Sequence, residues 1–160
     1  MMQRTDNICS ILIISNEHDV HLTSVVDKLQ KWGFSVFRLN TENLFSKYKI
    51  HIAYNDDQIV GSIVNIVTGD TIKIENIKTI WERRPMEPMN TFSPIGEEFL
   101  ETISVEQKSF YRQFRHSLNH CKWIGNPLSD LRASSKILQK SIAQKVGFNI
   151  PKTIISNNYN

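Results

Sequence analysis

The stretch that decides the fold is ICSILII at residues 8–14, a nearly continuous apolar run rich in β-branched side chains. Such a run is typical of a strand covered on both faces, as in a parallel sheet. In the polar turn that follows, Asp19 or a neighbour can accept the free N–H groups of a helix. The helix itself is indicated by apolar residues at helical spacing, which are Leu22, Val25, Val26, Leu29 and Trp32. Gly33 ends it and FSVFRL (34–39) predicts a second strand, so we expect a right-handed β-α-β unit.

The middle of the chain changes to short alternating segments. Residues 49–54, 59–67 and 71–75 alternate between apolar and polar side chains, and turn signals separate them. This pattern predicts a short antiparallel meander. IKTIW at residues 77–81 then predicts a return to the central sheet, and ERRP follows it at 82–85.

A long helix is predicted after an irregular surface loop over residues 85–94. Ser93 is its expected cap and Pro94 stands in its first turn. The expected buried stripe is interrupted by Gln107 and contains Leu100, Ile103, Phe110, Phe114 and Leu118.

Towards the end of the chain, residues 123–124 predict a short strand and residues 125–127 a turn. A last helix is expected to begin near Ser134 or Ser135, to end at Gly147, and to bury Leu138, Ile142 and Val146. A loop follows and enters a strand at Thr153. Because that strand has nothing after it to pair with, we expect it to be the start of a second domain that has been cut off.

Composition excludes several classes of protein. The chain has 160 residues, of which 40% are hydrophobic and 22% charged, and its net charge is +3. These values are typical of a soluble globular domain rather than a disordered chain or a charge-driven nucleic-acid binder. No run approaches the ~20 apolar residues of a membrane span. The two cysteines, Cys9 and Cys121, are expected to be reduced thiols in the cytoplasm.

Signatures of catalysis are missing from the sequence. The six glycines are scattered singly, so neither a P-loop nor a dinucleotide-binding fingerprint is present. His116 and His120 share a helix face, but only Cys121 lies near as a third ligand, so we expect no metal site. No local signature of a nucleophile with its base is present either, so we do not expect an autonomous hydrolase.

The best candidates for ligand contact are Arg83 and Arg84, which leave the end of an apolar strand. Ligands of open α/β sheets gather at the carboxyl ends of strands, and guanidinium groups suit carboxylate or phosphate. The alternative is that one arginine pairs with an acidic helix end while the other is solvated. Adjacent strand residues also face opposite ways, which argues against both reaching one ligand.

Three motifs together resemble the N-terminal, pre-ATP-grasp region of microviridin-type (MvdD-like) ATP-grasp ribosomal peptide maturases. WERRP (81–85) is similar to a W-x-R-R-P strand end, and WIGNP (123–127) to a W-[IV]-N-x-P element. The most specific match is the run from Ser135 to Asn157, which contains GF-x-IPKT. Structural roles are implied for the motif residues Trp81, Trp123, Asn126, Lys136, Gln139, Pro151 and Thr153.

The resemblance implies a small Rossmann-like α/β domain with a mainly parallel sheet, an antiparallel meander and flanking helices. Residues 1–128 would form the pre-ATP-grasp domain, and 129–160 a linker helix and the start of an ATP-grasp central domain. The implied parent is a carboxylate–amine ligase of the RimK/glutathione synthetase-like superfamily, which uses ATP and Mg²⁺ to close an amide or ester ring in a precursor peptide. Its ATP and Mg²⁺ ligands would lie beyond residue 160, so the fragment alone is expected to be inactive and to contain no catalytic residue. Implied partners are the precursor peptide, the ligase's own central and C-terminal domains and, where it dimerises, a second copy, but no nucleic acid or membrane.

Two other readings remain open at the level of sequence. One is a free-standing module that binds a peptide or a partner enzyme without catalysis. The other is a receiver-like signalling domain, which needs an acidic cluster at the first strand end and an aspartate after the third strand. The pairs Asn16-Glu17 and Trp81-Glu82 fit that requirement poorly.

Overall fold

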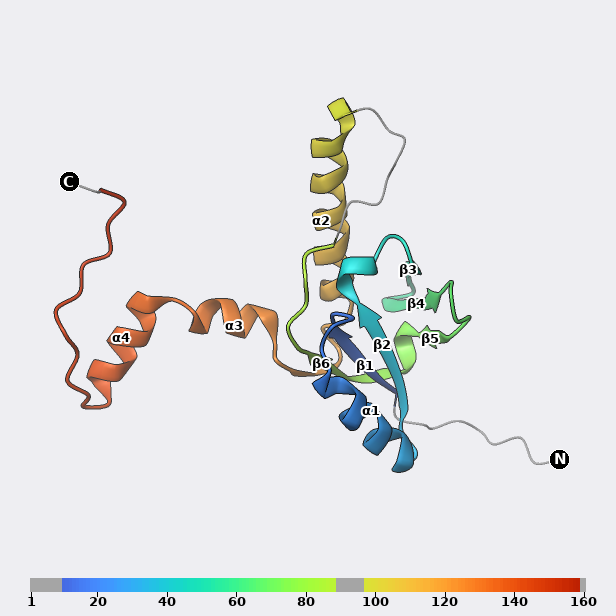
Figure 1. The fold of residues 1–160 in the computed structure, drawn as a ribbon, viewed down its shortest axis with the longest axis horizontal. Coiled ribbons are helices and arrows are strands. Elements are labelled where there is room, and N and C mark those ends of the chain that lie inside the picture. The colour runs from blue at the N-terminus through green and yellow to red at the C-terminus, as the bar shows by residue number, and fades with distance from the viewer. Residues whose placement is uncertain (1–9, 89–96, 159–160) are drawn as a thin grey trace. The chain divides into compact units, whose positions relative to one another are not determined.

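The computed structural model describes residues 10–88 and 97–158 (Figure 1). The chain divides into two compact units, residues 1–124 and 125–160. The expected boundary between residues 128 and 129 stays a prediction. The residues expected to open the long helix, Ser93 and Pro94, and the first cysteine, Cys9, lie outside the described residues.

The first unit is built on a four-stranded parallel sheet in the order β2-β1-β6-β7. Its strands are β1 (Ser10–Ser15), β2 (Ser35–Asn40), β6 (Ile77–Glu82) and β7 (Lys122–Ile124), and helix α1 (His21–Lys31) joins the first two. The parallel sheet and the β-α-β start are therefore confirmed. β1 is central because its apolar residues alternate between two covered faces, so neither face can turn to water.

A second sheet is the expected antiparallel meander, in the order β3-β4-β5. Its strands are β3 (Tyr48–Asn55), β4 (Gln58–Asn65) and β5 (Thr71–Lys73). Asp56 and Asp57 form the tight β3–β4 turn with φ of 45° and 62°, a conformation that short polar side chains tolerate. Gly61 allows close pairing in mid-strand, because a Cβ there would lie 2.0 Å from the carbonyl oxygen of His51.

Two apolar clusters hold the layers of this unit together. On one face of the parallel sheet, Ile11 and Ile13 pack with Leu22 of α1. On the other face, Leu12 and Ile14 pack with residues of the antiparallel sheet and of helix α2 (Leu100–Ser117). Of the expected α2 stripe, Phe114 and Leu118 are fully buried and Phe110 is partly buried. Short 3₁₀ turns cover Thr41–Asn43, Ile74–Asn76 and Glu97–Phe99.

One burial prediction in this unit is wrong. Trp32, expected on the buried stripe of α1, is 64% exposed. It stands just past the last helical residue, beside Gly33, whose φ of 85° ends the helix as predicted. The Lys28 ammonium group lies 5.5 Å from the centroid of its ring. The indole therefore lies at the surface beside Lys28 instead of entering the core.

The second unit contains α3 (Pro127–Ala133) and α4 (Lys136–Lys145). α3 was not predicted. The expected start of the last helix near Ser135 is confirmed, because the Ser135 hydroxyl accepts the Leu138 N–H, and Gly147 ends it with a φ of 89°. The expected burial is wrong, because Ile142 and Val146 are exposed and Leu138 is only half-buried. Residues 148–158 contain no strand, so that prediction is also wrong. Among the described residues, no helix combines the length and apolar character needed to span a bilayer.

Candidate functional site

Three parallel strands end at one edge of the sheet in the first unit. In the sheet order β2-β1-β6-β7, the chain continues from β1 to β2 on one side. From β6 it continues to β7 on the other side, so the two connections diverge at this edge. Such switch points are where open α/β sheets bind ligands. We call the polar residues gathered there the strand-end cluster, defined as Asn16, Asp19, Glu42, Glu82, Arg83 and Arg84.

Arg83 is held in place by a buried partner. Its backbone N–H donates to the Ile14 carbonyl at 2.9 Å, continuing the sheet by one residue. Its Nε lies 2.8 Å from Oδ2 of Asp19, whose side chain is only 2% exposed. The other oxygen of Asp19 accepts the His21 N–H at the start of α1. Asp19 thus fills the predicted helix-start role and also anchors the arginine.

Arg84 is arranged differently from its neighbour. Its φ is 47°, in the left-handed region that costs a non-glycine residue about 1–2 kcal/mol. Its carbonyl accepts the side-chain N–H of Asn16 at 2.7 Å, which fixes this backbone. Its side chain is exposed, and no described residue forms an ion pair or side-chain hydrogen bond with it. Of the two predicted arginines, Arg83 has an ion-pair partner and Arg84 has none among the described residues.

Glu82 ties the cluster to α2. Its Oε1 lies 2.5 Å from Nη2 of Arg115, and its side chain is 8% exposed. The Arg115 guanidinium also lies 5.3 Å from the ring centroid of Tyr111. Burial raises the pKa of Tyr111 far above its ordinary value, so this hydroxyl stays protonated. The ion pair links α2 to the end of β6.

Glu42 is the member that sequence reasoning missed. It is buried, and its Oε1 accepts the Glu17 N–H at 2.6 Å, whereas Oε2 has no partner among the described residues. Thr41 beside it donates to the Ser15 carbonyl at 3.2 Å. The only sequence signal was the polar run NTEN at residues 40–43, directly after the strand. Similarly, the Nη2 of Arg38 donates to the Asn16 carbonyl, a contact that local patterns do not reveal.

The two tryptophans of the motifs lie in the sheet of the first unit. Trp81 packs with the cluster under α1, and the Arg83 guanidinium lies 5.9 Å from its ring centroid. Trp123 donates its indole N–H to the Leu118 carbonyl at 3.1 Å, which joins β7 to the end of α2. Both rings pack against the apolar clusters on the two faces of the sheet.

The remaining motif residues lie in the second unit and make local contacts. Asn126 accepts a backbone N–H at the start of α3 at 3.3 Å. Lys136 donates to the side-chain carbonyl of Gln139 at 3.2 Å, and the Gln139 amide caps the end of α3 at 2.6 Å. Thr153 donates to the Pro151 carbonyl at 2.9 Å. These residues therefore belong to a different compact unit from the strand-end cluster.

No three His, Cys, Asp or Glu side chains come together as a cation site in the parts of the chain that the structure describes. Asp19 and Glu82 already have arginine partners, which disfavours their use as magnesium ligands. Burial raises the pKa of the Cys121 thiol to about 11, and the thiol donates to the Ile77 carbonyl, so it is neither a nucleophile nor a ready metal ligand. The described residues therefore offer no ready set of carboxylate ligands for a magnesium ion.

The chain is similar to one known protein family in sequence and to several solved structures in fold. The sequence profile of the MvdD pre-ATP grasp domain matches residues 10–131. A Chryseobacterium gregarium RiPP-associated ATP-grasp ligase, solved with ADP and a leader and core peptide, is 26% identical with a TM-score of 0.83. The macrocyclases MdnB and MdnC of Microcystis aeruginosa MRC, the latter bound with precursor peptide MdnA, are 24% and 21% identical with TM-scores of 0.79 and 0.80.

The matches cover 93–94% of this chain but only 45–48% of those three structures. The chain thus spans about half the length of the proteins it resembles. No curated protein sequence matches it significantly.

Proposed function

The chain belongs to the MvdD pre-ATP-grasp domain family, and from this premise we propose that it is the N-terminal domain of a peptide-modifying ligase. The reaction would join a side-chain carboxylate of a ribosomally made precursor peptide to an amine or hydroxyl of the same peptide, with consumption of ATP. The observation that carries the proposal is the family match over residues 10–131 together with the fold shared with a peptide-bound ligase.

In this proposal the strand-end cluster forms one wall of the ligase's cleft. Arg84 is its contact residue, because its guanidinium is exposed and its backbone is fixed by Asn16. A guanidinium fork suits a carboxylate or a phosphate group, and both occur in the proposed reaction. Arg83, Asp19 and Glu82 hold the wall in shape through their ion pairs.

ATP and magnesium are assigned to the rest of the ligase. The described residues lack a group of carboxylates for a cation, and the sequence lacks a glycine-rich loop for phosphates. We therefore expect calorimetric titration of ATP into residues 1–160 alone to give no heat of binding. We also place the ligase in the cytoplasm, where both ATP and ribosomal peptides are made.

Activity of the ligase that carries this chain tests the proposal. Mass spectrometry of a precursor peptide incubated with the purified ligase should show the loss of one water for each ring closed, and only when ATP is supplied. A protein that binds the peptide but never modifies it would instead be a binding module without catalysis, and the proposal would fail.

Replacing Arg84 tests the role of the wall. We expect Arg84→Ala to lower kcat/KM about tenfold, the effect of losing one charged hydrogen bond, without lowering the melting temperature. Arg84→Gly is the matched control for the backbone, because glycine adopts the positive φ without strain. It should lose as much activity as Arg84→Ala while melting slightly higher. If activity and melting temperature fall together in both variants, Arg84 is structural.

A further inference from the structure

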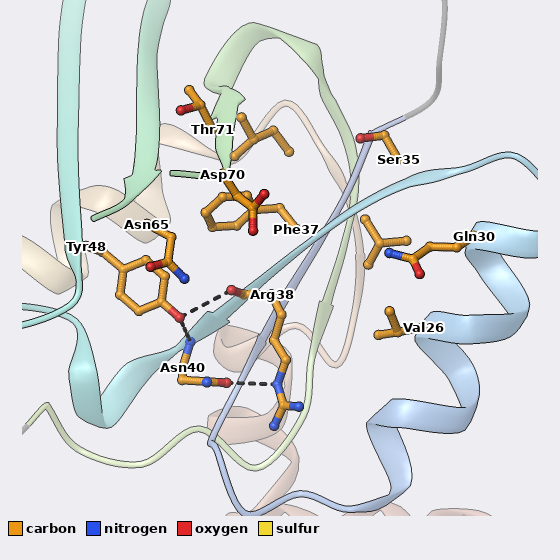
Figure 2. Close-up of a pocket in the computed structure, with 12 residues that line it drawn as sticks. Val26, Gln30, Ser35, Phe37, Arg38, Asn40, Tyr48, Asn65, Asp70 and Thr71 are labelled. Carbon is orange, nitrogen blue, oxygen red and sulfur yellow. Dashed lines mark hydrogen bonds between the residues drawn. The ribbon is translucent and has the colours of Figure 1, made fainter. Parts of the chain in front are cut away.

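A groove separate from the strand-end cluster runs along the open edge of β2. Its volume is about 380 Å³, within the ~300–1,000 Å³ of ordinary ligand pockets. One wall is α1, with Val26 and Gln30, and the other is the start of β5, with Asp70 and Thr71 (Figure 2). In the described parts of the chain β2 pairs only with β1, so its outer edge faces the groove unpaired.

Tyr48 shows which backbone groups of β2 point outward. Its hydroxyl donates to the Arg38 carbonyl at 3.3 Å and accepts the Asn40 N–H at 3.2 Å (Figure 2). Backbone groups of alternate residues in a strand face the same side, so the N–H and C=O of Val36 and the N–H of Arg38 also face the groove. These three groups form a short hydrogen-bonding template that the tyrosine leaves uncovered.

The charge in the groove selects the kind of ligand. Asp70 accepts a hydrogen bond from Thr68 at 2.6 Å, and no cation pairs with it among the described residues. Its carboxylate points towards the middle of the groove in Figure 2. The Arg38 guanidinium is already occupied by Asn40 and by the backbone of Asn16. A basic side chain opposite Asp70 is therefore favoured.

We propose that this groove binds an extended stretch of the precursor peptide, which adds to β2 as a further strand and places a basic side chain against Asp70. The inference rests on the proposed function for the identity of the peptide. A strand beside β2 would lie between the two walls, and its side chains would alternate between Val26 and Asp70. A second copy of the chain is disfavoured as the occupant. Its own β2 would have to enter the groove together with the helix α1 that packs beside it, and a groove of 380 Å³ has no room for a strand and a helix.

The test uses the ligase that carries this chain and two fluorescein-labelled synthetic peptides. Both alternate threonine and valine, and the central residue is lysine in one and glutamate in the other. Anisotropy should show the lysine peptide binding more tightly, and hydrogen exchange should slow at the amides of residues 36 and 38. N-methylation of the peptide amides that face β2 should abolish this protection.

Two variants separate the charge from the backbone template. Asp70→Asn should weaken the lysine peptide about two- to fivefold, the size of a partly exposed ion pair, and Asp57→Asn at the β3–β4 turn is the matched control with no effect. Val36→Pro removes an outward N–H that β1 does not use, and should weaken both peptides about tenfold. Thr71→Arg, which fills the groove, gives the same loss if Val36→Pro does not fold.

The outcomes distinguish this inference from the proposed function. If hydrogen exchange at residues 36 and 38 of β2 does not change, or if Asp57→Asn weakens peptide binding as much as Asp70→Asn does, the inference about the groove is wrong. This holds even where the ligase still modifies its precursor. Slowed exchange at β2 that depends on protein concentration, without peptide, shows that a second copy occupies the edge and also overturns it. A ligase that modifies no peptide at all fails the proposed function instead.

Discussion

The two units of the chain carry similar apolar patterns but bury them very differently. In the first unit, Leu12, Ile13 and Ile14 of β1 are 0% exposed, because helices and a second sheet cover both faces. In the second unit, Ile142 and Val146 on and beside α4 are 51% and 65% exposed. Apolar spacing therefore predicts an element, whereas burial depends on a partner surface that the spacing does not reveal.

The largest expected effect is in the core of the first unit. Phe114→Ala removes a fully buried ring and should lower the free energy of unfolding by about 3–5 kcal/mol. Urea unfolding followed by tryptophan fluorescence measures this, since Trp81 and Trp123 lie in the same unit. A loss under about 1 kcal/mol would contradict the burial described for this face.

A smaller loss is expected at the polar edge of the same unit. Asp19→Asn keeps the acceptor for the His21 N–H but removes the charge that Arg83 faces. We expect the free energy of unfolding to fall by about 1–3 kcal/mol. A double-mutant cycle with Arg83→Met isolates the pair, because the double variant should lose less than the sum. Strict additivity of the two losses would show that the ion pair contributes nothing.

The matching substitution in the second unit should have little effect. Ile142→Ala shortens a side chain that is half exposed, so the free energy of unfolding measured with urea should change by less than about 0.5 kcal/mol. This contrast with Phe114→Ala is the direct measure of the difference between the units. Losses of similar size at the two positions would mean that α4 is covered and that the comparison is wrong.

The smallest expected effect depends on pH. A hydrogen bond from Lys47, followed by one from Asn43, lowers the pKa of Glu17 below its ordinary value of 4.5. The stability from this pair is therefore fully present above pH 4.5 and is lost as the pH falls through the lowered pKa. Lys47→Met should cost slightly at pH 7 and nothing once Glu17 is protonated. An equal cost at both pH values would rule out the carboxylate as the partner.

Much of the fold was predictable because its signals are local. The apolar run of β1, the turn at Asp56 and Asp57, and the glycines that end α1 and α4 each act within a few residues. The short helix α3 was missed because Gly125 and Pro127 read as a turn, although Pro127 occupies a first helical position that proline favours. Gln107, which was expected to interrupt the apolar stripe of α2, is itself buried in the structure.

The candidate site was predictable only in part. Two arginines after a strand are visible in the sequence, and so is an acidic residue at a helix start. Their pairing joins Arg83 to Asp19 across 64 positions, and Arg115 reaches Glu82 across 33. For Glu42 the local signal is only the polar run after β2, and its burial results from strands that meet only in the folded state. Contacts of this range follow from topology, which residue spacing does not encode.

The central position of β1 also has a consequence for biosynthesis. One neighbour, β2, follows after a single helix, but the other, β6, is separated from β1 by β2 and the whole antiparallel meander. Long-range parallel pairing is slow because loop closure precedes any stabilising contact. During translation this strand, whose apolar residues are fully buried in the folded unit, is made before both of its neighbours and pairs with β6 only after residues 77–82 have been made. We therefore expect chaperones to bind the nascent chain until residue 82 has emerged from the ribosome.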